Sequence, residues 1–121
     1  MALVLIASGD RDGCARVAAL LHERGHATFT AGPGDAAVEA ASERRPDLVL
    51  LDLGPGGSEA LRRLRSCVPG VPVVMVAASA DVGAAVHAMK AGAADVLSRP
   101  VDDQALAGAV EAALALRPPS G

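Results

Sequence analysis

The stretch RPDLVLLDLGPGG, residues 45–57, decides the fold of this chain. Its apolar residues follow one another without alternation, which predicts a strand buried on both faces, as in the middle of a parallel sheet. The run reaches Asp52, and a glycine- and proline-containing loop follows at once. A strand of this kind delivers a carboxylate to the rim of a sheet, so Asp52 is the first candidate for a functional side chain.

Short apolar runs alternate with helix-period segments along the rest of the chain. The predicted strands are residues 3–8, 26–31, 47–53, 71–79 and 93–98. The predicted helices are residues 12–25, 35–45, 58–67, 81–92 and 102–116. This order predicts an α/β fold, a doubly wound five-stranded parallel sheet flanked by five helices. The first, third and fourth strands are continuous apolar runs and belong in the middle, with the other two toward the edges.

The carboxyl ends of parallel strands meet at one edge of the sheet, where ligands bind in folds of this class. We therefore expect the chemistry of the chain at this rim. The rim residues that accompany Asp52 are predicted to be Ser8, Gly9, Asp10, Gly54, Ala77, Ala78 and Arg99.

Length and composition indicate one domain, predicted to be residues 1–116, followed by a tail or linker at 117–121. The net charge of −3, without any dense basic stretch, predicts no nucleic-acid partner for this domain and no anionic membrane surface. The opening run MALVLIAS is too short to cross a membrane and has no basic leader. We expect a cytoplasmic protein.

Three residue types narrow the function further. Cys14 and Cys67 lie far apart without metal-ligand spacing, so both are predicted to be buried apolar residues of a reducing compartment. Phe29 is the only aromatic residue, which argues against a flavin or base-stacking site. The three histidines are predicted to be solvated surface residues without partners; they are His22, His26 and His87.

Four stretches, in this order and near this spacing, resemble the receiver domain of bacterial two-component response regulators. They are LLHERGH (20–26), RPDLVLLDL (45–53), VPVVMVAAS (71–79) and AMKAGAADVLSRPVD (88–102). The resemblance covers nearly the whole chain and implies a flavodoxin-like sheet with strand order 2-1-3-4-5. It also implies that the aspartate ending the third strand, Asp52 here, accepts a phosphoryl group from a histidine kinase.

Several residues depart from what the resemblance implies. The family holds Mg²⁺ with two acidic residues at the end of the first strand, and those positions are Ser8 and Gly9 here. The phosphoryl-binding hydroxyl residue of the fourth strand corresponds to Ala77, and the aromatic switch residue of the fifth strand to Val96. The lysine before proline corresponds to Arg99, which keeps the charge as a planar fork. The loop after the acceptor is also shorter than the family's.

Asp10 is the one acid beside these positions. With Asp52 it could reach a metal only through an altered loop, which the flexibility of Gly9 would permit. The other interpretation is that Asp10 or Asp12 caps the first helix, where a carboxylate accepts free N–H groups and suits the positive end of the dipole. We favour the cap, and we expect no bound cofactor, with Mg²⁺ at most weakly held.

Two functions stay open at this point. The first is a non-enzymatic pseudo-receiver that acts by protein–protein interaction with weak or no Mg²⁺-dependent phosphorylation. The second is a phosphorylatable receiver that uses Asp10 and Arg99 in place of the usual groups. In either case the expected partners are a histidine kinase or a downstream effector, and no enzymatic activity is predicted.

Two contacts follow from these expectations. Arg99 is predicted to form a bidentate, partly buried pair with Asp52, at a cost of roughly 3–5 kcal/mol for breaking it if the pair is fully buried. A weak homodimer or heterologous contact is predicted on the face of the fourth helix, fifth strand and fifth helix. That face would draw on Val82, Val86, Met89, Lys90, Asp95, Leu106 and Val110, some of which must be core.

Overall fold

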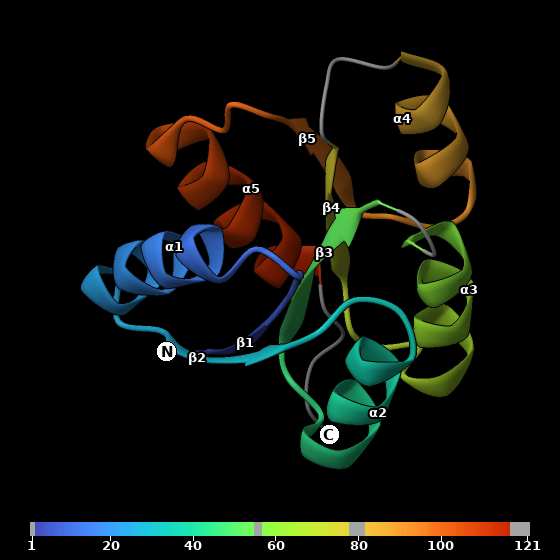
Figure 1. Cartoon of the computed structure of the whole chain (residues 1–121), viewed down its shortest axis with the longest axis horizontal. Helices are drawn as coiled ribbons and strands as arrows, with labels where there is room; N and C mark the ends of the chain where they lie inside the picture. Colours follow the sequence, from blue (N-terminus) through green and yellow to red (C-terminus); the bar gives the residue numbers. More distant parts are fainter. Residues whose placement is uncertain (1, 55–56, 78–81, 117–121) are drawn as a thin grey trace.

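The computed structural model describes residues 2–54, 57–77 and 82–116. In this part of the chain five strands alternate with five helices, as predicted. The strands are β1 (Leu3–Ala7), β2 (Ala27–Ala31), β3 (Leu48–Leu53), β4 (Val73–Ala77) and β5 (Asp95–Ser98). The helices are α1 (Arg11–Glu23), α2 (Asp35–Arg44), α3 (Gly57–Cys67), α4 (Val82–Lys90) and α5 (Asp103–Leu116) (Figure 1).

All neighbouring strands are parallel, and their order is β2-β1-β3-β4-β5. The predicted order is therefore confirmed, with the continuous apolar strands in the middle and β2 and β5 at the edges. Helices α1 and α5 cover one face of the sheet, and α2, α3 and α4 cover the other (Figure 1). This is the two-sided coverage that an all-parallel sheet requires.

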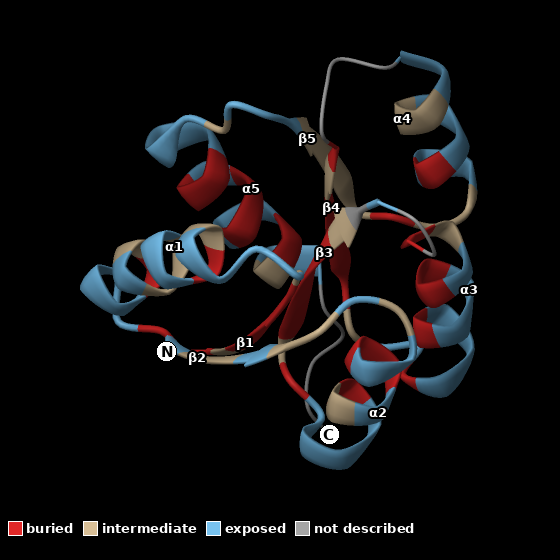
Figure 2. Ribbon diagram, in the orientation of Figure 1, coloured by how far each residue is buried: buried red, intermediate tan, exposed pale blue. Residues whose placement is uncertain are grey.

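Side chains of the central strands alternate between two separate apolar cores, because successive residues of a strand point to opposite faces. The buried strands between the helix layers are the red ribbons of Figure 2. The core beneath α2, α3 and α4 includes Leu5, Ala7, Val49, Leu51, Val73 and Met75. The core beneath α1 and α5 includes Val4, Ile6, Leu48, Leu50 and Val74. Residue parity along a central strand therefore decides which helices its side chain meets.

Most elements are a residue or two shorter than predicted. Helix α1 ends at Glu23, and Gly25 follows with φ of +86°, a left-handed conformation that glycine adopts without strain. The amide of His26 then donates to the carbonyl of Leu21 at 3.0 Å, which closes the helix end. None of the described helices has the length and apolarity that crossing a membrane demands.

Helix α4 is attached to the sheet by little apolar contact. Ala88 is its only buried residue. Val82 is 75 % exposed, and Val86 and Met89 are each 47 % exposed. Lys90, at the end of the helix, is also exposed. This outer surface is the part of the predicted interaction face that the structure leaves open to solvent.

Some residues of the predicted interaction face were expected to be core, and these are Leu106 and Val110, which are 4 % and 0 % exposed and belong to the core beneath α1 and α5. They form the stripe that α5 must bury against the sheet. Cys67 was expected to be buried, but it is exposed at the end of α3, whereas Cys14 is buried as predicted. The sequence around Cys67 does not determine which side of the last turn of α3 faces the core.

The prediction that the histidines are surface residues without partners is wrong for His26, which is 8 % exposed. Its Nδ1 accepts the amide N–H of Ala2 at 3.2 Å, and its Nε2 lies 2.8 Å from Oε1 of Glu111 on α5. Since Nδ1 is the acceptor, Nε2 carries the hydrogen and donates it to the carboxylate. His22 is exposed as predicted but does contact Thr28, at 2.9 Å between Nε2 and Oγ1.

Replacing His26 by alanine is expected to destabilise the domain by about 1–3 kcal/mol, because the buried Ala2 amide loses its acceptor and Glu111 its donor. Urea unfolding of the two proteins measures this difference. The matched control is His87→Ala on the exposed surface of α4, expected to stay within about 0.5 kcal/mol of wild type. Equal stability of the His26 and His87 variants would contradict the structural role of His26.

Candidate functional site

The side chain of Asp52 lies on the face of the sheet that α1 and α5 cover. It has the same parity on β3 as Leu48 and Leu50, both of which belong to the core beneath those helices. It is the last residue of that series, opposite Val76 on β4, and its side chain is 20 % exposed. The apolar core thus ends in a carboxylate at the rim, where the sequence predicted it.

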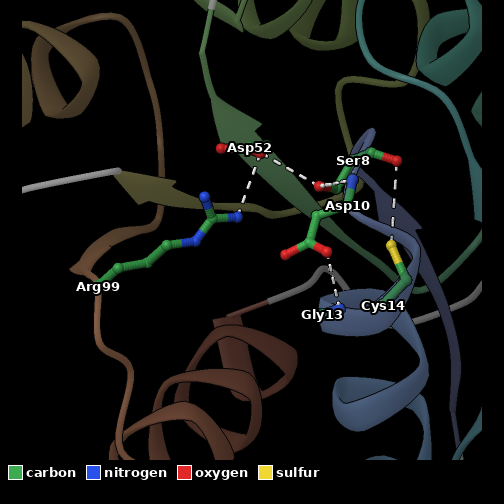
Figure 3. A network of polar contacts seen from close by, with 6 residues as sticks. All are labelled: Ser8, Asp10, Gly13, Cys14, Asp52 and Arg99. Carbon is green, nitrogen blue, oxygen red and sulfur yellow. Dashed lines mark hydrogen bonds and ion pairs between the residues drawn. The ribbon is translucent and has the colours of Figure 1, made fainter.

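One oxygen of Asp52 takes two polar contacts. The hydroxyl of Ser8, just after β1, donates to Oδ2 at 3.1 Å. The guanidinium of Arg99, just after β5, donates from Nη2 to the same Oδ2 at 3.2 Å. Figure 3 shows the two groups approaching the same oxygen from different directions. The predicted proximity of Arg99 and Asp52 is therefore found.

The form of this pair differs from the prediction in two respects. It is a single contact between Nη2 of Arg99 and Oδ2 of Asp52, not a bidentate one, and Ser8 donates to the same oxygen. The side chains of Arg99 and Asp52 are 39 % and 20 % exposed. The cost predicted for a fully buried pair therefore does not apply, because water screens a pair at this depth.

The end of β1 is organised around the first turn of α1. Oδ1 of Asp10 accepts the amide N–H of Gly13 at 3.1 Å, and Asp10 occupies the N-cap position. The amide of Asp10 donates to Oγ of Ser8 at 3.1 Å. The capping interpretation of Asp10 is thus the one the geometry supports. Ser8 links this cap to Asp52 through its single hydroxyl group.

Cys14 is a member of this network that the sequence interpretation missed. Its thiol lies 3.9 Å from the carbonyl oxygen of Ser8 and donates to it (Figure 3). Burial raises the pKa of the Cys14 thiol above its usual range, and the nearby negative charge of Asp10 raises it further. The thiol therefore stays protonated and serves as a weak donor. Cys14 follows Asp10 by about one helical turn, and this spacing was the feature of the sequence that could have indicated its place in the network.

Comparison with known proteins decides the family. The model of the response regulator receiver domain matches residues 4–111. This chain belongs to the response regulator receiver family. It is 35 % identical over 115 residues to the transcriptional regulatory protein ZraR of Escherichia coli O157:H7, covering 93 % of this chain and 26 % of that protein.

Two further relatives agree with this assignment. The chain is 35 % identical over 114 residues to the DNA-binding response regulator MtrA of Mycobacterium tuberculosis, covering 92 % of this chain and 50 % of MtrA. The receiver domain of NtrX from Brucella abortus superposes with a TM-score of 0.88 at 31 % identity, covering 93 % of this chain and 98 % of that one. The chain thus spans a quarter to a half of the two curated relatives' lengths.

The other predicted site positions of this receiver contribute little polar chemistry. Ala77, at the end of β4, is 4 % exposed and has no hydroxyl group, although its carbonyl accepts the Arg99 amide at 2.9 Å. Val96 packs partly buried against the core beneath α2, α3 and α4. Gly54 is exposed, and its carbonyl accepts the amide of Gly57 at 2.9 Å at the start of α3. Ala78 lies outside the described residues.

The oxygen atoms at the rim of this receiver do not form a set that fits Mg²⁺. Among the residues the structure describes, no three acidic, histidine or cysteine side chains gather in a way that could hold a metal ion. Asp10 caps α1 through Oδ1, which leaves one carboxylate oxygen there, while Ser8 offers a neutral hydroxyl and Gly9 offers no side chain. On Asp52 the guanidinium of Arg99 already contacts Oδ2, so only Oδ1 remains for an ion. Mg²⁺ prefers several anionic or carbonyl oxygens in near-octahedral array.

The strength of the Arg99–Asp52 contact can be measured with a double-mutant cycle. We expect a coupling energy of about 0.5–1 kcal/mol between Arg99→Ala and Asp52→Asn in urea unfolding, because the pair is charged and partly exposed. The coupling should fall as salt is added, since screening weakens exposed charge pairs.

Arg16 provides the control for this cycle. It pairs with Asp103 at 3.1 Å, but the two side chains are 70 % and 59 % exposed. Arg16→Ala is therefore expected to change stability by less than about 0.5 kcal/mol. A coupling energy within error of zero for Arg99 and Asp52 would show that the rim pair contributes nothing to the folded state.

Proposed function

We propose that this domain is a pseudo-receiver, a signalling module that acts by binding protein partners, with weak or no Mg²⁺-dependent phosphorylation of Asp52. One observation carries the proposal. Oδ2 of Asp52 accepts hydrogen bonds from both Arg99 and Ser8, so the carboxylate has a permanent cation and a permanent hydroxyl donor. The neutralisation that a transient ligand would bring is supplied by the chain itself.

The remaining chemistry of phosphoryl transfer supports this proposal. A carboxylate nucleophile attacking a phosphoryl group needs donors for the phosphoryl oxygens as well as compensation of its own charge. Arg99 compensates the carboxylate, but Ala77 has no hydroxyl to donate. Gly9 has no side chain where the family has an acid. Ser8 likewise has no carboxylate where the family has an acid, so the rim lacks three groups that the reaction uses, and no described residue replaces them.

A second function is favoured by a specific observation and is kept as the alternative. Asp52 is partly open to solvent, and its Oδ1 accepts no hydrogen bond from any described residue. Arg99 also retains the positive charge of the family's lysine. A phosphorylatable receiver that accepts its phosphoryl group on Oδ1 from a histidine kinase would use these two features. Its rate would depend on Arg99 more than on Mg²⁺.

The interaction surface that we propose is the exposed side of α4. Val82, Val86 and Met89 give it an apolar character, with Lys90 beside them. Because the predicted α5 residues lie in the core, the surface is smaller than the sequence suggested, which fits a weak, reversible contact. The proposed partners are a histidine kinase, an effector or a second copy. The name of MtrA assigns DNA binding to that protein, whereas the net charge of −3 here provides no electrostatic basis for it.

Incubation with acetyl phosphate and Mg²⁺ tests the proposed function directly. We expect far less than stoichiometric labelling of Asp52 by mass spectrometry, and Mg²⁺ affinity in the millimolar range or weaker by calorimetry. Asp52→Asn should leave both results unchanged. Stoichiometric labelling of wild type that is lost in Asp52→Asn would replace the proposal by the alternative.

Restoring the missing acids should reverse the metal result. Ser8→Asp combined with Gly9→Asp is expected to raise Mg²⁺ affinity by about tenfold or more, since it returns two carboxylate ligands to the rim. The position tolerates the change, because a Cβ at Gly9 would meet only Cδ of Pro33, at 4.0 Å. The control adds the same charge on exposed helix surfaces, with Ala19→Asp and Ala36→Asp. Equal gains in the two variants would mean that added charge alone attracts the ion.

Self-association through α4 can be tested by sedimentation equilibrium. We expect a weak dimer, with a dissociation constant of about 0.1–1 mM, that Val86→Asp abolishes by placing a charge on the apolar surface. Leu116→Asp is the control, since Leu116 is also an exposed apolar residue, at 72 %, but lies at the end of α5. A dimer that Leu116→Asp disrupts and Val86→Asp leaves intact would place the contact elsewhere.

A further inference from the structure

A cavity of about 460 Å³ opens between α1, α5 and the sheet face that carries Asp52. Its apolar walls include Val17 and Leu20 of α1 and Val101 and Leu106 from the α5 side, with Ile6 and Leu50 as the floor. Sites for small organic ligands are typically apolar hollows of about 300–1,000 Å³ with a few polar groups at one end. The cavity therefore has the size and lining of a ligand site.

The composition of the chain explains why this space is not filled. Protein interiors normally pack with few voids larger than a water molecule. Phe29 is the only aromatic residue, and it packs against the opposite core, beneath α2, α3 and α4. The side chains between α1 and α5 are aliphatic or smaller, so the two helices stand on the sheet without a large ring between them.

The charges at one end of the cavity distinguish between classes of ligand. Three carboxylates line it, those of Asp10, Asp52 and Asp103, and two guanidiniums, those of Arg16 and Arg99. Each guanidinium is already paired, Arg16 with Asp103 at 3.1 Å and Arg99 with Asp52 at 3.2 Å. The rim thus has one carboxylate more than it has cations.

Asp10 is the carboxylate without a cationic partner among the described residues. Its Oδ1 accepts from Gly13, whereas its Oδ2 accepts no hydrogen bond from this part of the chain. Oδ1 of Asp52 is open in the same sense, since both contacts of that side chain go to Oδ2. An anionic ligand could still use the free N–H groups of Arg16 or Arg99, but it would add negative charge to a rim that already has more carboxylates than cations. A cationic ligand meets acceptors that are already free.

We propose that the cavity binds a small organic cation with an apolar body, of the class of arylalkyl or alkyl amines. The ammonium group donates to the carboxylates of Asp10 and Asp52, and the body packs against Val17, Leu20 and Leu106. The site rests on the proposed function, because it requires Asp52 to stay unphosphorylated beside Arg99. Ligand occupancy is then the input that changes the rim, in place of a phosphoryl group.

Three small molecules of matched shape test the ligand class: phenethylamine, phenethyl alcohol and hydrocinnamate. Each is titrated into the intact chain while amide chemical shifts are followed by NMR. We expect phenethylamine to bind with a millimolar dissociation constant, about tenfold more tightly than the alcohol and more tightly still than the carboxylate. The shifts should centre on Val17, Leu20 and Leu106. Equal or tighter binding of hydrocinnamate, no saturable binding, or shifts centred elsewhere would overturn the proposal.

Asp10→Asn tests the role of the charge. Asparagine caps a helix about as well as aspartate, so the fold is retained while one negative charge is removed. We expect phenethylamine affinity to fall about fivefold, with the alcohol unaffected. Asp12→Asn is the matched control, since Asp12 lies in the same helical turn but is exposed and does not line the cavity. Equal effects of the two substitutions would contradict direct contact with Asp10.

Val17→Phe tests the cavity itself. A ring at this position occupies the space that the ligand body would fill, so binding of all three compounds should be lost while the melting temperature stays at or above that of wild type. A clear loss of stability would indicate an overpacked core in place of an open cavity, and would overturn the proposal.

The labelling experiment with acetyl phosphate separates this inference from the proposed function. If acetyl phosphate labels Asp52, and the unlabelled protein binds the amine as expected, the proposed function alone is refuted. Unlabelled Asp52 without amine binding refutes the inference alone.

Discussion

The strict alternation of side chains along β3 is the constraint on which the rest of this structure depends. Both faces of the sheet are buried by helices, so residues 48–51 of β3 belong alternately to one core and the other. Leu48 and Leu50 point toward α1 and α5, and Asp52 must therefore do the same. The contacts with Ser8 and Arg99, the helix cap beside them and the adjoining cavity all lie on the side that this parity selects.

Features set by local sequence could be predicted. The apolar runs of β1, β3 and β4 indicated the middle of the sheet without reference to any contact. The N-cap of Asp10 follows from a rule that involves only its own helical turn. The approach of Arg99 to Asp52 followed from the fold, because residues that end parallel strands meet at one rim. The sequence thus predicted which residues form the site better than it predicted which of their atoms contact one another.

Features that depend on distant contacts could not be predicted in the same way. His26 is buried and contacts Glu111, 85 positions away on α5, and nothing near His26 in the sequence signals this contact. Whether Cys67 and Leu106 are buried depends on how their helices are rotated about their own axes. The sequence pattern defines a helix only to within about a residue or two, so it does not settle this rotation. The cavity depends on the summed volume of side chains from two helices and a sheet, a quantity that no single motif encodes.

Because few apolar contacts hold α4 against the sheet, this helix is the element best suited to change its position when the domain binds a partner. Local opening free energies are lowest where few apolar contacts hold an element, and α4 buries only Ala88. Its backbone amides should therefore exchange with solvent hydrogen well before those of α5, which buries five residues. A helix that detaches readily can alternate between arrangements without unfolding the sheet. The exposed surface of α4 thus lies on the element whose position a bound partner can shift at the lowest cost in free energy.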